Sequence, residues 1–347
     1  MELSARDLNR TLLHRQHLLD RVDLPVADAV RHLVGLQAQE NLSPFLGLAA
    51  RLRAFDPYDV TRGLEDRWLV RMVCLRGTIH LLTPQDALGL RPFTRPAQER
   101  ERRSSVNTRP ALHLDREELA GAVGAVLADG PLPFTELGEA LAGHLPGVPA
   151  GALAHLARVD TPLVQLPPRG TWRGAGGVVL QRVDRWLGRP EEPGDPAGLV
   201  RRYLRAFGPA TAADVTTWSG ATGITAVLKG MTDLVTHVGP DGRTLFDVPD
   251  GEIVPGDAPA PARLLGTYDN LWLSHAARDR VTTPEARKAW MGSNGGLACT
   301  VFVDGMLTGL WRHGPDGISV EAFRRLTRGE QRDLDDEIGR VEALLAS

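Results

Sequence analysis

Apolar residues recur every three or four positions through the first part of the chain. This spacing predicts amphipathic helices over Ser4–Asp20 and Val26–Leu36, and a shorter helix over Pro57–Leu64. The stretch Trp68–Leu82 is rich in β-branched and apolar residues, and Arg76-Gly77 divides it into two strands. Three helices followed by a two-stranded ribbon are the element order of a winged helix, so we expect one here.

The same order of elements returns twice, as a repeat of structure rather than of sequence. The second set of predicted helices is Glu117–Leu127, Phe134–Leu141 and Ala150–Val159, followed by strands Leu163–Leu166 and Gly177–Arg182 around Arg169-Gly170. The third set is Leu199–Phe207, Ala212–Trp218 and Thr222–Leu228, followed by strands Leu234–Val238 and Thr244–Val248 around Asp241-Gly242. Three tandem winged-helix modules therefore fit the chain.

Towards its C-terminal end the chain becomes rich in proline and glycine, which indicates a linker and then a β-rich region. Cys299–Val303 and Met306–Trp311 flank Asp304-Gly305, a residue pair typical of a tight β-hairpin. Apolar residues within Val320–Leu345 then predict one buried helix face, with a break near Gly329.

The predicted elements define an α+β protein that is mainly helical. We expect a first winged helix in residues 1–90, a second in residues 91–190 and a third in residues 191–254. Residues 255–347 are expected to form a C-terminal β-rich or β-barrel domain that ends in a helix.

Composition and charge exclude several classes of protein. The 347 residues contain no apolar run long enough to cross a bilayer, and Met1–Leu13 lacks the order of a signal peptide, so we expect a cytoplasmic protein. A net charge of −3 argues against a protein that coats nucleic acid without specificity. Cys74 and Cys299 have no further Cys or His at metal-ligand spacing, so we expect reduced thiols and no bound metal.

The usual catalytic signatures are missing from the sequence. It has no G-x-S-x-G elbow, P-loop, dinucleotide fingerprint or H-E-x-x-H pair. The glycines of Gly292–Gly296 lack the Lys-Ser/Thr of a phosphate-binding loop, so this segment is expected to be a simple loop. Serine hydrolase, nucleotide-dependent and zinc protease mechanisms are therefore not indicated.

The segment Gly35–Glu40 holds two glutamines, Gln37 and Gln39, one residue apart. On a helix, positions i and i+2 point about 200° apart, whereas in extended backbone they face the same side. Both amides can serve one site only if the preceding helix ends at or before Gln37. Ser43 before Pro44 predicts that the helix ends near Gln37–Asn41. The alternative is that both glutamines merely satisfy carbonyls at the helix end.

Two further polar sets have ordinary structural alternatives. Arg76, Thr78 and His80 would share one face of the first ribbon by strand alternation, either as a functional surface or as the solvent side of a half-buried hairpin. Tyr268-Asp269-Asn270, before Leu271–Leu273, predicts a tight turn into a buried strand. Its Asp is better suited to an Asx turn than to catalysis, so this set is either a structural turn or part of a site.

Several of these segments together resemble the AlkZ/YcaQ family of winged-helix DNA glycosylases. The resemblance runs through most of the chain, and the order and spacing of its segments make it specific. Those segments are Gly35–Gln39, Leu75–His80, Gln165–Pro168 before Trp172-Arg173, Phe207–Ala210 before Trp218–Gly220, Tyr268–Leu271, and Val303–Gly305 before Gly309–Trp311.

In that family the catalytic motif is Gln, an apolar residue, then Gln or Asp. Gln37-Ala38-Gln39 is similar to the two-glutamine branch, which is associated with resistance to self-made DNA-alkylating natural products. The resemblance implies a monofunctional glycosylase that removes N7-alkylated purine adducts, either bulky natural-product monoadducts or interstrand crosslinks, in base excision repair. It also implies no cofactor, double-stranded DNA with alkylated purines as the partner, and a monomer that joins the nucleoid when bound to DNA.

Neutral amides suit this chemistry. Alkylation at N7 places a positive charge on the purine, so the base leaves neutral and no strong general acid is needed. The enzyme must supply a positioned water and dipoles that favour the oxocarbenium-like sugar of the transition state. A glutamine carries an acceptor and two donors without titrating, so we assign these tasks to Gln37 and Gln39 jointly.

DNA contacts are expected from the first ribbon, from the polar stretch Gln98–Arg109 and from Trp311-Arg312. The full set is Arg76, Thr78, His80, Arg100, Arg102, Arg103, Trp311 and Arg312. Guanidinium groups in this set would neutralise phosphates, and DNA affinity should fall with salt. The alternative for Gln98–Arg109 is a disordered charged loop.

Two functions without catalysis stay open. A winged-helix transcription regulator would have a basic recognition helix and a dimerisation helix, and the sequence shows neither plainly. A drug-binding resistance protein would bind the free alkylating compound and release no base.

Overall fold

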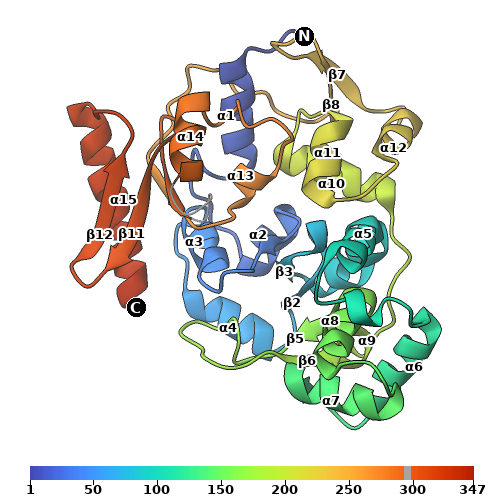
Figure 1. The fold of residues 1–347 in the computed structure, drawn as a ribbon. Helices are drawn as coiled ribbons and strands as arrows, with labels where there is room; N and C mark the ends of the chain where they lie inside the picture. The colour runs from blue at the N-terminus through green and yellow to red at the C-terminus, as the bar shows by residue number, and fades with distance from the viewer. Residues whose placement is uncertain (293–297) are drawn as a thin grey trace. The chain divides into compact units, whose positions relative to one another are not determined.

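The computed structural model describes residues 1–292 and 298–347, which form two units (Figure 1). The first unit comprises residues 1–57, 197–218 and 223–347, and the second comprises residues 58–196 and 219–222. Of the predicted loop Gly292–Gly296, residues 293–296 lie outside the described part of the chain. The division into four domains remains a prediction.

Helices form a large part of the first unit. α1 (Ala5–Arg15) begins where the sequence predicts, because the Ser4 hydroxyl accepts the Asp7 N–H and the Asp7 carboxylate accepts the Ser4 N–H. The other helices of this unit are α2 (Val26–His32), α3 (Ser43–Ala49), α10 (Pro196–Phe207), α11 (Ala212–Ser219), α12 (Ile224–Gly230), α13 (Asn270–Leu273), α14 (Pro284–Gly292) and α15 (Arg328–Ala346).

The strands of the first unit form two small antiparallel sheets, besides the two-residue β1 (Leu36–Gln37). One is the hairpin of β7 (Val235–Val238) and β8 (Thr244–Asp247), as predicted. The other has the order β12-β11-β10-β9, with β9 (Arg263–Leu265), β10 (Cys299–Val303), β11 (Met306–Gly314) and β12 (Gly317–Ala322). The described residues show no closed barrel, so the C-terminal region is β-rich but the expectation of a β-barrel is wrong.

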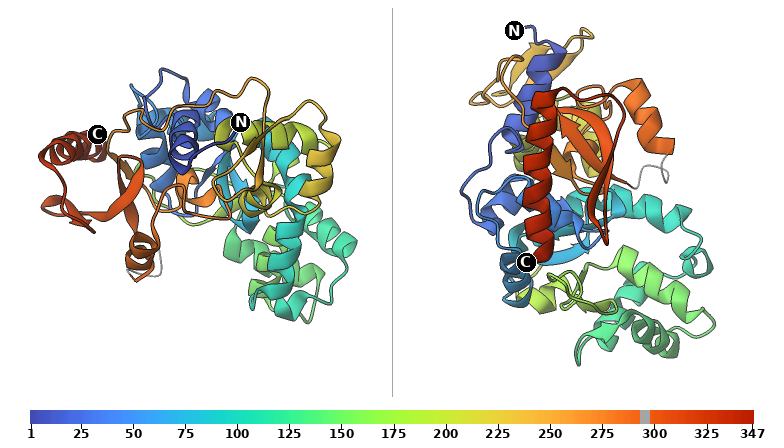
Figure 2. Two further views of the ribbon diagram at one scale, coloured as in Figure 1. Left: turned by 90° about the horizontal axis from the view of Figure 1, so that it is seen from above. Right: turned by 90° about the vertical axis from the view of Figure 1, so that its left-hand side faces the viewer.

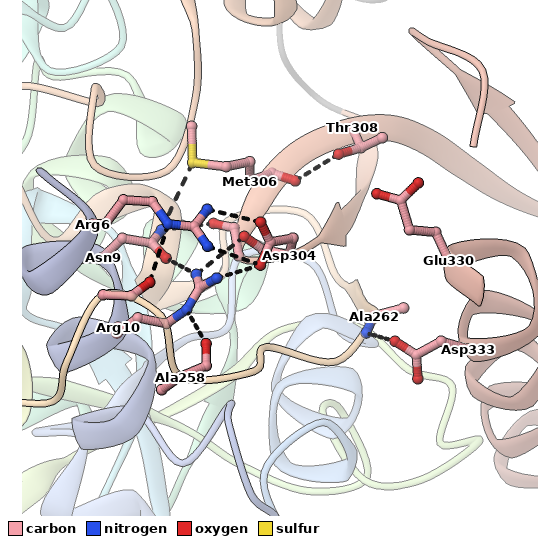
Figure 3. Close-up of polar contacts among 12 residues, drawn as sticks. Arg6, Asn9, Arg10, Ala258, Ala262, Asp304, Met306, Thr308, Glu330 and Asp333 are labelled. Carbon is pink, nitrogen blue, oxygen red and sulfur yellow. Dashed lines mark hydrogen bonds and ion pairs between the residues drawn. The ribbon is translucent and has the colours of Figure 1, made fainter. Parts of the chain in front are cut away.

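Asp304-Gly305 forms the predicted turn between β10 and β11, with φ angles of 50° and 73°. Figure 3 shows how α1 holds this turn: Arg6 Nη1 donates to Asp304 Oδ2 at 2.7 Å, and Arg10 donates to the Asp304 carboxylate and carbonyl. Asn9 Nδ2 donates to Gly305 O at 2.8 Å. The buried charge of Arg10 is thereby compensated, and the hairpin is fixed to α1.

The C-terminal helix α15 runs alongside the four-stranded sheet and packs against β9 and β12 (Figure 2). A capping box at Thr327 and Glu330 starts it, and Leu334 and Val341 are buried on its inner side. The prediction of one apolar helix face within Val320–Leu345 is wrong for its first residues, because Val320 lies in the strand β12. Pairing with β11 keeps Val320 in a strand, and the capping box at Thr327 sets where the helix begins.

The second unit packs helices beside five antiparallel strands in the order β3-β2-β5-β6-β4. Its helices are α4 (Pro57–Glu65), α5 (Pro84–Ser104), α6 (Arg116–Val126), α7 (Phe134–His144), α8 (Ala150–Asp160) and α9 (Val183–Leu187). Its strands are β2 (Val70–Val73), β3 (Ile79–Leu82), β4 (Leu132–Pro133), β5 (Leu163–Gln165) and β6 (Val179–Arg182). Figure 1 shows α7 and α8 side by side, and Leu141 and Leu153 belong to the core of this unit.

Both predicted ribbons of this unit, β2–β3 and β5–β6, are confirmed as antiparallel hairpins. They are joined, because β2 also pairs with β5 through Arg71 opposite Gln165 and Met72 opposite Val164. Two ribbons in one sheet differ from two separate wings. The number of winged-helix modules remains a prediction.

The long helix α5 was not predicted, because its sequence is polar and contains Pro92 and Pro96. Pro92 has no N–H to donate to the buried Leu88 carbonyl four residues earlier, and the Glu192 N–H donates to that carbonyl instead, at 3.2 Å. Arg91 donates to the Val73 carbonyl at 2.8 Å and ties the helix to β2. A hydrogen bond from outside the helix therefore replaces the one that Pro92 removes.

Two buried histidines make the stability of the protein depend on pH. Burial, with the nearby charge of Arg280, lowers the pKa of His275, and burial with the charge of Arg76 lowers the pKa of His80 to about 3. Below pH 6.5 the unfolded chain binds protons that the folded chain does not bind, so stability is complete above 6.5 and is lost as the pH falls.

We expect the free energy of unfolding to decrease steadily from about pH 6.5 to 4.5, as chemical denaturation at each pH would measure. His275→Gln should make this decrease smaller. The exposed His313 is the control, because His313→Gln should leave the pH dependence as it is. An identical pH dependence in His275→Gln would contradict the assignment.

Candidate active site

The helix before the two glutamines stops abruptly. α2 ends at His32, before the predicted end near Gln37–Asn41, and Val34 and Gly35 follow with φ angles of 54° and 89°. The Gly35 N–H donates to Val30 O at 2.9 Å and closes the helix end. A β-branched residue in the left-handed region costs about 1–2 kcal/mol, so this stop is held by other contacts.

The stop places the first glutamine in extended backbone, because β1 is Leu36–Gln37. The condition for the two amides to serve one site, a helix that ends before Gln37, is therefore confirmed. Gln37 is 6% exposed and Ala38 is 1% exposed, whereas Gln39 is exposed in the bend that leads to α3. Convergence of the two side chains on one substrate remains a prediction.

Asn270 lies against this segment. Its Nδ2 donates to Gly35 O at 2.9 Å and to Leu33 O at 3.4 Å, and Asn270 is 4% exposed. These carbonyls lie on either side of the left-handed turn, one from the helix end and one from the residue before β1. The C-terminal region thus satisfies the backbone beside the glutamines.

A buried ion pair fixes the residue before Asn270. Asp269 accepts two hydrogen bonds from Arg51, each of 2.8 Å, and both side chains are at most 2% exposed. Asp269 Oδ1 also accepts the Leu271 N–H at 2.9 Å, which confirms the predicted Asx turn. The segment that follows is the helix α13, so the predicted buried strand is wrong.

The polar row on the first ribbon is not formed as predicted. Leu75–Gly77 is a 3-10 turn in which Arg76 has a φ of 55°, so strand alternation does not pass through it. His80 is only 1% exposed: its Nδ1 lies 2.9 Å from Thr78 O and its Nε2 lies 3.2 Å from an Arg76 nitrogen. His80 is therefore a buried neutral histidine, and only Arg76 and Thr78 of the three are partly exposed.

The three arginines of the polar stretch lie on α5, so the alternative of a disordered loop does not hold for them. Arg102 is 8% exposed, and its Nε donates to Asp160 Oδ2 at 3.0 Å. Arg100 and Arg103 are exposed and border a groove of about 860 Å³, together with Arg95 and Phe93. Arg102 is thus a structural residue, and its two neighbours are available to a ligand.

Trp311 and Arg312 are adjacent on β11 but differ in exposure. Trp311 is 2% exposed, and its indole N–H donates to Leu265 O at 3.0 Å. It is therefore a core residue, and the expectation that it contacts DNA is wrong. Arg312 is exposed and lies 3.4 Å from Glu321. Strand alternation accounts for the difference.

Cys74 and Cys299 are not bonded to each other, and no group of three or more His, Cys, Asp or Glu side chains that could hold a metal ion occurs in residues 1–292 and 298–347. Burial raises the pKa of the Cys74 thiol to about 12, which makes it inert. In the same residues no helix is both long and apolar enough to span a membrane.

Three comparisons place this geometry among known proteins. A family model described as DNA glycosylase AlkZ-like matches residues 30–344. The interstrand DNA cross-link repair glycosylase of Streptomyces sahachiroi is 29% identical over 365 residues, which cover 98% of this chain and 96% of that protein. The solved structure of Streptomyces sahachiroi DNA glycosylase AlkZ has a TM-score of 0.83 and 23% identity, and covers 99% of this chain and 98% of that one.

The family match defines the class of the protein as a DNA glycosylase, which confirms the enzyme class that the sequence predicted. The chain belongs to the AlkZ-like family. The solved structure shows that the α+β fold is shared.

Sequence reasoning missed Arg51, and it identified Asn270 without its hydrogen-bonding role. Tyr268-Asp269-Asn270 was singled out as a turn, and this tripeptide is the signal that could have led to them. Their partners lie 218 and 235 positions away in sequence, so no local pattern connects them.

The arginines of α5 offer a matched pair for mutation. Arg102→Ala removes a partner of the buried Asp160, so we expect the free energy of unfolding to fall by roughly 2 kcal/mol or more. Arg103→Ala alters an exposed side chain and should change the free energy of unfolding by less than about 0.5 kcal/mol. Urea denaturation of both variants decides the point, and equal stability of the two would contradict the assignment of Arg102.

Proposed function

We propose that this DNA glycosylase hydrolyses the N-glycosidic bond of N7-alkylated purines, with bulky monoadducts and interstrand crosslinks as its substrates. The observation that carries the proposal is the Gln37-Ala38-Gln39 segment, which leaves α2 in extended backbone and matches the family motif residue by residue. The cross-link repair glycosylase of Streptomyces sahachiroi, 29% identical, supports the substrate class. The two-glutamine motif supports a role in resistance to a self-made alkylating agent.

Gln37 and Gln39 position the water and favour the developing charge on the sugar. The buried Gln37 has restricted rotamers, so its dipole is oriented before the substrate binds, while the exposed Gln39 is open to solvent and ligand. Neither amide titrates, and the buried His80 stays neutral because its pKa is about 3. The leaving base carries its own positive charge, so the site needs no acid.

Arginines supply the contacts to the DNA backbone. We retain Arg76, Arg100, Arg103 and Arg312, with Thr78, as the proposed DNA-binding set, because each is at least partly exposed. Guanidinium groups bind phosphates without reading sequence, so affinity should fall as salt rises. The enzyme acts as a monomer in the cytoplasm, on double-stranded DNA and without a cofactor.

We expect Gln37→Ala and Gln39→Ala each to lower the single-turnover rate of excision at least tenfold with little loss of DNA affinity, because each removes an oriented dipole rather than a phosphate contact. The assay uses a duplex with one N7-alkylguanine, alkaline cleavage of the abasic site and gel quantification. Gln181→Ala is the matched control, a buried glutamine 7% exposed in the second unit, and should excise normally. Full activity of the double variant Gln37→Ala/Gln39→Ala would refute the proposal.

The same assay separates the rival functions. A transcription regulator or a drug-binding protein would bind DNA or the free compound and give no strand breaks after alkali.

The single-turnover rate should be flat between about pH 6 and 8, because no proposed catalytic group titrates in this range. Excision rates at saturating enzyme, measured across this range, provide the test. His80→Gln serves as the comparison and should also give a flat profile. A sharp transition that disappears in His80→Gln would assign the catalysis to this histidine instead.

A further inference from the structure

We propose that Asn270 is a positioning residue for the reaction: its amide holds the backbone before Gln37 and thereby orients both catalytic glutamines. This inference rests on the proposed role of Gln37 and Gln39 in excision. Asn270 touches no substrate in this proposal. It acts through the backbone alone.

The argument begins with the carbonyls at the end of α2. Inside the helix end, Val30 O accepts the Gly35 N–H and Arg31 O accepts the Val34 N–H. Leu33 O and Gly35 O point beyond the helix, and a single side chain, Asn270, donates to both, at 3.4 and 2.9 Å. One amide therefore spans the left-handed turn that redirects the chain into β1.

Water is a poor substitute for this amide. Asn270 is 4% exposed and Gly35 and Leu33 are buried, so loss of the donor leaves two carbonyls without a replacement from bulk solvent. Val34 is β-branched at a φ of 54°, so the turn relaxes when its hydrogen bonds are removed. Relaxation at this point rotates Leu36 and Gln37, the next residues along the chain.

The neighbouring residue holds the other flank of the glutamine segment. Asp269 binds Arg51 with two hydrogen bonds, and Arg51 Nη1 also donates to Gly47 O at 2.9 Å, within the helix α3 that follows Gln39. The Asp269-Asn270 pair thus reaches the backbone before Gln37 directly and the helix after Gln39 through Arg51. A short segment fixed at both flanks keeps its side chains in one arrangement.

The charged and titratable groups around this end of α2 are few. Asp269 and Arg51 are paired with each other, and Arg202 donates to Arg31 O at 2.7 Å. His17 and His32 stack with ring centroids 4.5 Å apart, and burial lowers the pKa of both, that of His17 to about 4. With a pKa of about 4, His17 stays neutral in the pH range used below.

Asn270→Asp is the decisive variant, because it has the shape of asparagine and a donor that depends on pH. The ionised carboxylate donates nothing and faces two carbonyl oxygens, whereas the protonated carboxyl donates to Gly35 O as the amide does. Burial and these oxygens raise the pKa of the introduced carboxyl. We expect a single-turnover rate at least tenfold below that of the parent protein at pH 8 that recovers as the pH falls to 5.5, with DNA affinity unchanged.

The parent protein should show no such recovery. Asn9→Asp is the matched control: Asn9 is 2% exposed, and its Nδ2 also donates to two backbone carbonyls, those of Gly305 and Arg280, at 2.8 and 2.7 Å. It carries the same chemical change at a second buried asparagine, and its excision rate should follow that of the parent protein. Thermal melts at each pH establish that all variants are folded.

A second measurement needs no substrate. Hydrogen exchange followed by mass spectrometry should show faster exchange of the amides in residues 33–39 in Asn270→Ala and not in Asn9→Ala. This exchange measurement replaces the rate assay if Asn270→Asp does not fold at pH 8. A folded Asn270→Asp with the parent rate at every pH overturns the inference, and so does unchanged exchange in residues 33–39. Full activity of Gln37→Ala/Gln39→Ala would instead refute the proposed function, and the exchange result would still decide whether Asn270 holds the segment.

Discussion

The end of α2 is the constraint on which the candidate site depends. Helical backbone would send Gln37 and Gln39 in opposite directions, and the left-handed residues Val34 and Gly35 prevent this by turning the chain into β1. A β-branched residue is a poor choice for that conformation when its neighbours alone are considered. The turn persists because hydrogen bonds from Asn270 satisfy the carbonyls beside it.

The same arrangement suits the proposed use of two amides in the reaction. In the proposed reaction a positively charged purine leaves without protonation, so a site of neutral, oriented dipoles suffices for departure of the base. His80, which the sequence analysis placed among the DNA contacts, is buried with a pKa of about 3 and is a structural residue. What matters in such a site is the direction of two dipoles, and direction is set by backbone.

The sequence was most accurate where neighbours decide the outcome. The Ser4 cap, the turn at Asp304-Gly305 and the helices with a regular apolar period are confirmed, because capping, turn geometry and amphipathicity act within a few residues. The prediction failed at α5, where Glu192 takes the carbonyl that Pro92 leaves free, and at Val320, which strand pairing places in β12. Both outcomes depend on residues that no local window contains.

The candidate site divides in the same way. The sequence by itself determined that two amides lie one residue apart after a helix, and that arginines cluster near residue 100. Only the tertiary structure decided that the helix stops at His32, that Arg102 is buried against Asp160 while Arg103 is exposed, and that Asn270 holds the turn. The physical reason is that burial and hydrogen bonding pair residues up to 235 positions apart in sequence, whereas propensity reports only on neighbours.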